Sequence, residues 1–273
     1  MSKVRADVGL VHRGLAASRE KAQALIMAGL VFQREVRINK PSETVNDINL
    51  LRVKECTQPY VSRGALKLEK ALQVFGADVS GKVAMDIGSA AGGFTDVLLR
   101  NGAAHIYSID VGYGQLDWTI RNDRRVTVME RTNARYLTSE SFPITPTLTV
   151  MDVSFISLKL ILPVAGRLMK ENGVFYVLIK PQFEAGRGKV GKKGVVRDPL
   201  VHVSVIEGIL KFSIEIGYAM TQLDFSPIKG PEGNIEYLAE LVPISKEMQP
   251  INARQITCVV ASAHHHLIKT RIE

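Results

Sequence analysis

Short apolar runs alternate with amphipathic segments over most of this chain, and that alternation restricts the possible folds more than any other feature. The runs read VAMDIG, HIYSID, VTVME, LTVMDVSF and GVFYVLIK. Helical patterns lie between them, at residues 64–75, 93–100, 158–169 and 200–216. Polarity alternates little within the runs, which is typical of strands buried on both faces. Strands that alternate with helices predict an α/β fold with a doubly wound parallel sheet.

Both ends of the chain depart from this pattern. Near the C-terminus, YAMTQLDFSPI and IEYLAELVPI read as two strands joined by a Gly/Pro-rich loop, which predicts an antiparallel hairpin at the sheet edge. The N-terminal residues read as two helices and a small hairpin, with Ser18 as a helix N-cap. Polarity shifts over residues 55–61. We therefore expect a small α+β domain over residues 1–56, a linker over 57–62 and the main domain over 63–273.

Composition excludes several classes of protein. With 46% hydrophobic and 23% charged residues, the chain is neither disordered nor collagen-like. Its apolar stretches fall short of the roughly 20 residues that span a bilayer, and Asp7 interrupts any N-terminal signal sequence. We expect a cytoplasmic protein without a membrane segment. Cys56 and Cys258 lack metal-ligand spacing, which indicates free thiols with packing roles and no metal site. His264–His266 reads as a surface strand or tail.

Positive charge is concentrated in two segments. The net charge is +8, with ten Lys and Arg against six Asp and Glu up to Cys56, and six against one from Lys180 to Arg197. Such an excess attracts polyanions, so nucleic acid is the first partner to consider. A basic surface that serves only solubility is the alternative.

A glycine-rich segment follows the first apolar run of the main domain. It covers Asp86–Phe94 and reads DIGSAAGGF. Gly88 permits a sharp turn, and Gly92 and Gly93 permit close approach of the backbone to a ligand. The spacing differs from G-x-G-x-x-G, and no Gly-Lys-Ser/Thr follows, which disfavours pyrophosphate and triphosphate ligands. A turn that is only structural is the alternative.

The next apolar run ends at Asp110, where a carboxylate accepts hydrogen bonds from ribose hydroxyls. An adenosine without a phosphate chain fits best, which indicates S-adenosylmethionine as the cofactor. Tyr113, Phe155 and Trp118 either flank the adenine or pack in the core. The residues that we expect to hold the cofactor are Asp86, Gly88, Ser89, Gly92, Gly93, Phe94, Asp110 and Asp152.

Charged residues stand where other runs end. Asp152 and Lys180 each follow an apolar run, Glu236 lies in GNIEYL, and Lys67 lies in the preceding helical segment. Parallel strands deliver their last residues to one edge of the sheet. Lys180 is costly to desolvate unless it pairs with carboxylates or becomes neutral, and Asp152 and Glu236 are available. Taken singly, Asp152 is as well explained as a helix N-cap with Ser154 as rival, and Glu236 and Lys67 as exposed residues. Taken together, these alternatives explain the pattern less well.

Six segments resemble the TlyA family of ribosomal RNA 2′-O-methyltransferases, also labelled hemolysins. They read YVSRGALKL, DIGSAAGGFTD, SIDVGYGQL, MDVSFISL, IKPQFEAGRGKVGKKGVVRD and GNIEYL, and the resemblance covers nearly the whole chain. The resemblance implies a Rossmann-like, FtsJ-type catalytic domain that transfers a methyl group from S-adenosylmethionine to a cytidine ribose. The catalytic Lys-Asp-Lys-Glu set of that type matches Lys67, Asp152, Lys180 and Glu236.

The N-terminal unit resembles the RNA-binding module first known from ribosomal small-subunit protein four. The match rests on Arg5, Asp7, Ser18–Ala22, Ala28–Gly29 and Lys40–Pro41, whereas Gln33–Glu35 replaces the usual Asn-Gly or Asp-Gly turn. Five Lys and Arg with four Gly also make residues 186–197 a basic loop, which we expect to close over RNA. The residues expected to bind RNA are Arg5, Arg19, Lys21, Lys40, Arg187, Lys189, Lys192 and Arg197.

A ribose hydroxyl is a poor nucleophile at neutral pH, so methyl transfer needs alignment and removal or sharing of its proton. Lys180 acts either as the general base, in its neutral form, or as a cation that orients the 2′-oxygen. Asp152 and Glu236 then fix the direction of Lys180, and Lys67 positions the ribose. In-line transfer to oxygen needs no metal.

Two other functions compete with this hypothesis. A membrane-lytic protein, as the hemolysin label suggests, lacks support because the chain has no long apolar span. A non-catalytic factor for ribosome assembly would be marked by loss of the charged residues, and all four are present. We therefore expect ribosomal RNA in ribosomal subunits as the partner, with no membrane and no obligate protein partner.

Overall fold

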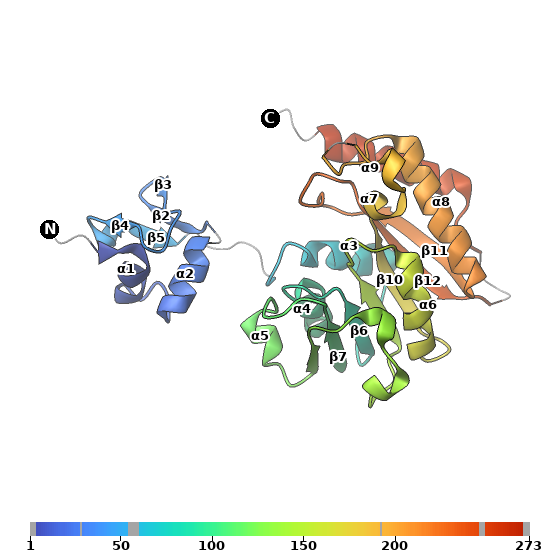
Figure 1. The fold of residues 1–273 in the computed structure, drawn as a ribbon, viewed down its shortest axis with the longest axis horizontal. Coiled ribbons are helices and arrows are strands. Elements are labelled where there is room, and N and C mark those ends of the chain that lie inside the picture. Colours follow the sequence, from blue (N-terminus) through green and yellow to red (C-terminus); the bar gives the residue numbers. More distant parts are fainter. Residues whose placement is uncertain (1–3, 28, 54–59, 192, 246–248, 270–273) are drawn as a thin grey trace. The chain divides into compact units, whose positions relative to one another are not determined.

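The computed structural model describes residues 4–27, 29–53, 60–191, 193–245 and 249–269. The chain divides into two compact units, Met1–Pro59 and Tyr60–Glu273 (Figure 1). Residues 57–59 of the predicted linker lie outside the described residues. Each unit has its own hydrophobic core and is considered separately.

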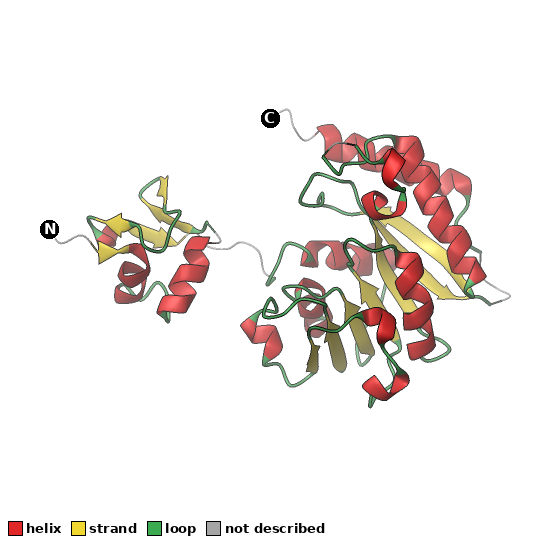
Figure 2. Ribbon diagram, viewed as in Figure 1, coloured by secondary structure: helices red, strands yellow, loops and turns green. Residues whose placement is uncertain are grey.

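The N-terminal unit combines two helices with two small antiparallel sheets (Figure 2). One sheet pairs β1 with β4, and the other has the strand order β3-β2-β5. Leu10, Ile26 and Val31 are fully buried in its core. The elements are β1 (Val4–Arg5), α1 (Ala6–His12), α2 (Arg19–Met27), β2 (Val31–Gln33), β3 (Val36–Arg37), β4 (Thr44–Val45), η1 (Ile48–Leu50) and β5 (Leu51–Val53).

The turn between β2 and β3 forms without glycine. Arg34 and Glu35 connect the two strands, and Arg34 takes a φ of +53°, which non-glycine residues adopt at some cost. Arg52 supports this turn, because its Nε donates to the carbonyl of Arg34 at 2.7 Å and its guanidinium pairs with Glu35 at 2.8 Å. The predicted hairpin is therefore present in spite of its unusual turn sequence.

The second unit contains a seven-stranded sheet with the order β11-β12-β10-β9-β6-β7-β8. The five strands β6 to β10 run parallel, and β12 is antiparallel to both β10 and β11, so the predicted edge hairpin is confirmed. The strands are β6 (Val83–Ile87), β7 (His105–Ile109), β8 (Val126–Met129), β9 (Leu148–Met151), β10 (Val174–Ile179), β11 (Tyr218–Phe225) and β12 (Tyr237–Pro243).

Helices cover both faces of this sheet, as Figure 2 shows. Residues of α3 and α4 pack on one face, and residues of α6, α8 and α9 pack on the other. Along β10, Phe175 and Val177 face the second group, whereas Tyr176 and Leu178 face the first. The helices are α3 (Ala65–Phe75), α4 (Gly93–Arg100), α5 (Trp118–Arg121), α6 (Leu158–Leu168), α7 (Pro181–Glu184), α8 (Pro199–Glu215) and α9 (Ala253–Lys269), with short 3-10 turns η2 (Ala134–Tyr136), η3 (Ser139–Ser141) and η4 (Arg187–Lys189).

The strand order places a ligand site at one edge of the sheet. From β6 the chain proceeds to β7 and β8 on one side, and it returns to β9 and β10 on the other. A crevice forms at the carboxyl ends of the strands where this order reverses, and open α/β sheets bind their ligands there.

The C-terminal expectations need two corrections. His264–His266 lies in helix α9, not in a strand or tail, because Ile256, Val260 and Ala263 follow helical spacing and are buried against the sheet. Cys258 is exposed on the same helix and has no packing role, while Cys56 lies outside the described residues. Among the described residues, no helix has the length and apolarity to cross a lipid bilayer.

Candidate active site

Two adjoining cavities lie at the carboxyl ends of the central strands. The main cavity, of about 550 Å³, is bordered by the segment before α3, the glycine-rich loop after β6, the residues after β9 and β10, and the loop before β12. The side cavity, of about 310 Å³, lies at the ends of β6, β7 and β8. Both linings include Gly88, Ala90, Asp152, Ser154 and Phe155. The pair therefore offers room for two ligands that meet beside Asp152.

Lys67, Asp152, Lys180 and Glu236, which we call the tetrad, form one row of ion pairs in the main cavity. Lys180 Nζ lies 2.5 Å from Asp152 Oδ1, and Lys67 Nζ lies 3.2 Å from Asp152 Oδ2. Lys67 Nζ also lies 2.7 Å from Glu236 Oε2. The two lysine side chains are each 8% exposed, and Glu236 is 1% exposed. Two cations and two anions balance, so the row is electrically neutral when all four are charged.

Lys180 pairs with Asp152 as expected, but the partner of Glu236 differs from the expected one. Among the described contacts, Glu236 pairs with Lys67 and not with Lys180. Asp152 does not cap a helix, because residues 152–156 precede α6 and the N-cap is Ser157. Sequence position indicates which edge of the sheet a residue reaches, but not which neighbour its side chain contacts there.

Lys180 is oriented by two polar neighbours. Its Nζ donates to Ser154 Oγ at 2.9 Å and pairs with Asp152. An ammonium has three donors, so one remains for a ligand oxygen after these two contacts. Lys180 is therefore placed to donate to an oxygen in the main cavity.

For Asp152 and Lys67, pairing with opposite charges outweighs the effect of burial on the pKa. Burial alone would raise the pKa of Asp152, but Lys67 and Lys180 outweigh it and hold that pKa below its usual range. Burial alone would lower the pKa of Lys67, and Asp152 and Glu236 outweigh it in the same way, so that pKa is raised. Both groups are charged at neutral pH.

The glycine-rich loop packs directly against the tetrad. Gly88 has a φ of +86°, and a Cβ there would lie 2.8 Å from the backbone oxygen of Asp152. A Cβ on Gly93 would lie 2.9 Å from the first backbone nitrogen of α3. Gly92, with a φ of +90°, approaches Leu116 instead and is absent from both cavity linings. The main cavity is lined by Gly88, Ser89, Gly93 and Phe94 from this loop and the start of α4.

The two expected acidic cofactor residues lie in different surroundings. Asp110 lines the side cavity, where its carboxylate accepts hydrogen bonds from the N–H groups of Ala90 at 2.8 Å and Gly112 at 2.7 Å. Asp86 is fully buried, accepts a hydrogen bond from Thr95 Oγ1 at 2.6 Å, and lines neither cavity. Burial raises the pKa of Asp86 to about 7. Direct contact with a ligand is therefore open to Asp110 and not to Asp86.

Other residues of the side cavity were not expected from the sequence. Thr132 and Asn133 follow β8 and line the side cavity, and their polarity after an apolar run was the signal for them.

The three expected aromatic residues differ in their positions. Phe155 lines both cavities and is 91% exposed, with a φ of +63°. Tyr113 and Trp118 are 66% and 72% exposed and line neither cavity, so the expectation that they pack in the core was wrong, while contact with the adenine stays a prediction.

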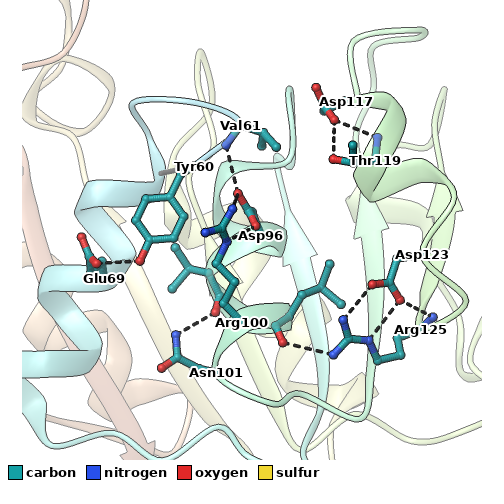
Figure 3. Close-up of polar contacts among 12 residues, drawn as sticks. Tyr60, Val61, Glu69, Asp96, Arg100, Asn101, Asp117, Thr119, Asp123 and Arg125 are labelled. Atoms are coloured by element: carbon teal, nitrogen blue, oxygen red, sulfur yellow. Dashed lines mark hydrogen bonds and ion pairs between the residues drawn. The ribbon is translucent and has the colours of Figure 1, made fainter. Parts of the chain in front are cut away.

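The first residues of the second unit are fixed to α3 and α4, as Figure 3 shows. The hydroxyl of Tyr60 donates to Glu69 at 2.6 Å, and the N–H of Val61 donates to Asp96 at 2.9 Å. Arg100 pairs with the same Asp96 at 2.6 Å and lies over the ring of Tyr60. This anchoring holds the following segment beside the main cavity, which it helps to line.

The expected RNA-binding residues fall into two groups. In the N-terminal unit, the buried carboxylate of Asp7 forms ion pairs with Arg5 at 2.9 Å and with Arg19 at 3.1 Å. Lys21 and Lys40 are exposed. In the second unit, Lys189 and Arg197 are exposed on the basic loop. Arg187 begins η4, and Lys192 lies outside the described residues. The basic loop also lines the main cavity through Val190 and Gly194.

The sequence profile of the FtsJ-like methyltransferases matches residues 60–241, which contain both cavities and the whole tetrad. The TlyA protein of Mycobacterium tuberculosis, named a 16S/23S rRNA (cytidine-2′-O)-methyltransferase, is 44% identical over 86% of this chain and 88% of its own length. The chain belongs to the TlyA family of FtsJ-like methyltransferases.

Two further relatives extend this TlyA-family match over both units. YqxC of Bacillus subtilis is 51% identical over 97% of this chain and 95% of its own length. A solved structure of a Streptococcus thermophilus protein that carries a hemolysin name is 44% identical, with a TM-score of 0.78 and full coverage of both chains. This chain and the solved Streptococcus thermophilus chain thus share their fold.

S-adenosylmethionine is the methyl donor of the enzyme, as the sequence indicated. The cavities fit such a molecule, because the side cavity presents the carboxylate of Asp110 and the glycine-rich loop borders both cavities beside Asp152. The expected enzyme class and cofactor are therefore confirmed.

Proposed function

We propose that the protein methylates the 2′-hydroxyl of a cytidine in ribosomal RNA, within ribosomal subunits in the cytoplasm. The row of ion pairs from Lys180 to Glu236, beside the glycine-rich loop, carries this proposal. The name of the Mycobacterium relative supports the choice of rRNA and of the cytidine ribose. The exposed lysines and arginines of both units support a polyanionic substrate.

The tetrad supplies alignment and charge stabilisation for this reaction. S-adenosylmethionine, when bound, supplies an electrophilic methyl carbon on a sulfonium. The free donor of Lys180 holds the 2′-oxygen in line with that carbon and stabilises the negative charge that develops on it as the hydroxyl proton leaves to solvent. The C–O bond forms as the C–S bond of the sulfonium breaks, and S-adenosylhomocysteine leaves. Asp152 and Ser154 fix the direction of Lys180, and Glu236 fixes Lys67, which positions the ribose.

Transfer of labelled methyl groups tests the proposed function. Purified small and large ribosomal subunits and naked rRNA are incubated with the enzyme and methyl-labelled S-adenosylmethionine, and the RNA is digested to nucleosides. We expect the label in 2′-O-methylcytidine and more transfer to subunits than to naked rRNA. Label on a base, or no label in any of these RNAs, would contradict the proposal.

The N-terminal unit is proposed as an RNA-binding module that contributes phosphate contacts. Replacing both Lys21 and Lys40 with alanine should reduce the slope of log affinity against log salt concentration by about 1.5, because two phosphate contacts are lost. Both side chains are exposed, so folding should be unaffected. The binding of rRNA over a series of salt concentrations measures this slope.

A charge-matched control uses Arg124 and Lys170, which are exposed at the opposite edge of the sheet from the cavities. Replacing these two with alanine removes the same charge and should leave the salt slope within error of the unmodified enzyme. Equal slopes for the Lys21/Lys40 variant and the unmodified enzyme would argue against this face as the docking surface.

A further inference from the structure

The C-terminal end of the basic loop is held by two buried side chains. Asn234 is 2% exposed and lies two residues before Glu236, and His202 in α8 is 0% exposed. Both side chains contact the backbone of Val196. This arrangement joins the basic loop, α8 and the strand that follows Glu236.

Asn234 binds the loop backbone with both ends of its amide. Its Oδ1 accepts a hydrogen bond from the N–H of Val196 at 3.0 Å, and its Nδ2 donates to the carbonyl of Gly194 at 2.9 Å. A carboxamide presents one acceptor and two donors, whereas a carboxylate presents acceptors alone. Asparagine therefore suits this position better than aspartate or an apolar residue of similar size.

His202 holds the other polar group of Val196. Its Nε2 lies 3.0 Å from the carbonyl oxygen of Val196, and a carbonyl only accepts, so Nε2 carries the hydrogen. Nδ1 then accepts a hydrogen bond from the hydroxyl of Tyr237 at 2.7 Å, and His264 Nε2 lies 3.2 Å from the same atom. Burial, with a smaller effect of His264, lowers the pKa of His202, in keeping with a neutral ring.

We infer that Asn234 and His202 are positioning residues that form a clamp on Val196 and hold residues 194–197 of the basic loop in one conformation beside the tetrad. This inference rests on the proposed function. The loop contains four glycines in residues 186–197, so its free backbone has much conformational entropy to lose. A loop that is ordered before RNA arrives avoids this cost on binding. The clamp therefore favours binding of the RNA substrate.

Limited proteolysis tests the clamp without any need for activity. Replacing Asn234 with alanine should accelerate native-state tryptic cleavage after Lys189, Lys193 and Arg197 by about tenfold, because both hydrogen bonds to the loop are lost. The matched control is Asn101→Ala at the C-cap of α4, a residue labelled in Figure 3, which removes one asparagine hydrogen bond, to the carbonyl of Val97, away from the loop.

Steady-state kinetics then test the role in RNA binding. Asn234→Ala should raise KM for ribosomal subunits about tenfold and leave the Kd for S-adenosylmethionine unchanged. Asn234→Asp retains the acceptor for Val196 but places a buried carboxylate oxygen against the carbonyl oxygen of Gly194, and should raise KM at least as much as Asn234→Ala. His202→Phe should act in the same direction, and its effect should be less than additive with that of Asn234→Ala, since both hold Val196.

Thermal unfolding of each variant identifies those that remain folded at the assay temperature, and Asn234→Ala decides the test if His202→Phe unfolds. Loop cleavage no faster in Asn234→Ala than in Asn101→Ala would overturn the clamp. Faster cleavage with an unchanged KM for subunits would overturn its role in RNA binding. If the unmodified enzyme methylates no subunit, the proposed function fails, whereas the cleavage ratio still decides the clamp.

Discussion

Replacing Lys180 with alanine should reduce methyl transfer by about 100- to 1000-fold, the range typical for loss of one preorganised donor to a developing oxyanion. The variant loses the donor that faces the main cavity and the partner of Asp152 Oδ1. Lys67 still pairs with Asp152 and Glu236, but these two carboxylates then share one cation, so thermal unfolding of the variant must show that it remains folded. Single-turnover transfer of labelled methyl to ribosomal subunits measures the effect.

Binding of S-adenosylmethionine to the Lys180→Ala variant should persist, since Lys180 follows β10 and the side cavity lies at the ends of β6, β7 and β8. Calorimetric titration with the cofactor checks this point. Lys170→Ala, at the opposite edge of the sheet, serves as the control and should retain full activity. Retained transfer in a purified Lys180→Ala reaction would remove Lys180 from the proposed mechanism.

Replacing Gly88 with alanine should abolish tight cofactor binding and lower the free energy of unfolding by about 1–3 kcal/mol. The new Cβ meets the backbone oxygen of Asp152 at 2.8 Å and has no flexible side chain to displace. The positive φ of +86° adds strain. The loop or Asp152 must shift, and both border the two cavities. Chemical denaturation and cofactor titration measure the two effects.

Gly76→Ala separates backbone strain from crowding. Gly76 ends α3 with a φ of +62°, and a Cβ there meets nothing within 4 Å. This variant should lose about 1 kcal/mol of stability and bind the cofactor normally. Equal cofactor affinity in Gly88→Ala and the unmodified enzyme would contradict the close approach of the loop to Asp152.

The sheet was predictable because its strands are buried on both faces. Runs such as GVFYVLIK have no polar face, and the packing of Phe175 and Tyr176 on opposite sides of the sheet explains why. Helix α9 was missed because the three adjacent histidines obscured the spacing of Ile256 and Val260. The non-glycine turn at Arg34 depends on Arg52, which is distant in sequence.

The sequence predicted which residues form the site better than it predicted which of them contact one another. Strand ends indicated that Asp152 and Lys180 share one edge, and they do. The choice of Lys67 as the partner of Glu236 depends on where α3 packs, which residue spacing does not reveal. Asp86 matched the same motif as its neighbours, yet the start of α4 covers its carboxyl group through Thr95.

Electrical balance within the tetrad restricts how the protein can change over evolution. Loss of one member leaves an opposite charge buried without compensation, which is far more costly than replacing a cation and an anion together by apolar side chains. A lineage that abandons methylation is therefore expected to lose these residues in oppositely charged couples. We therefore expect relatives that lack both Lys67 and Glu236, and none that lack only one of the two.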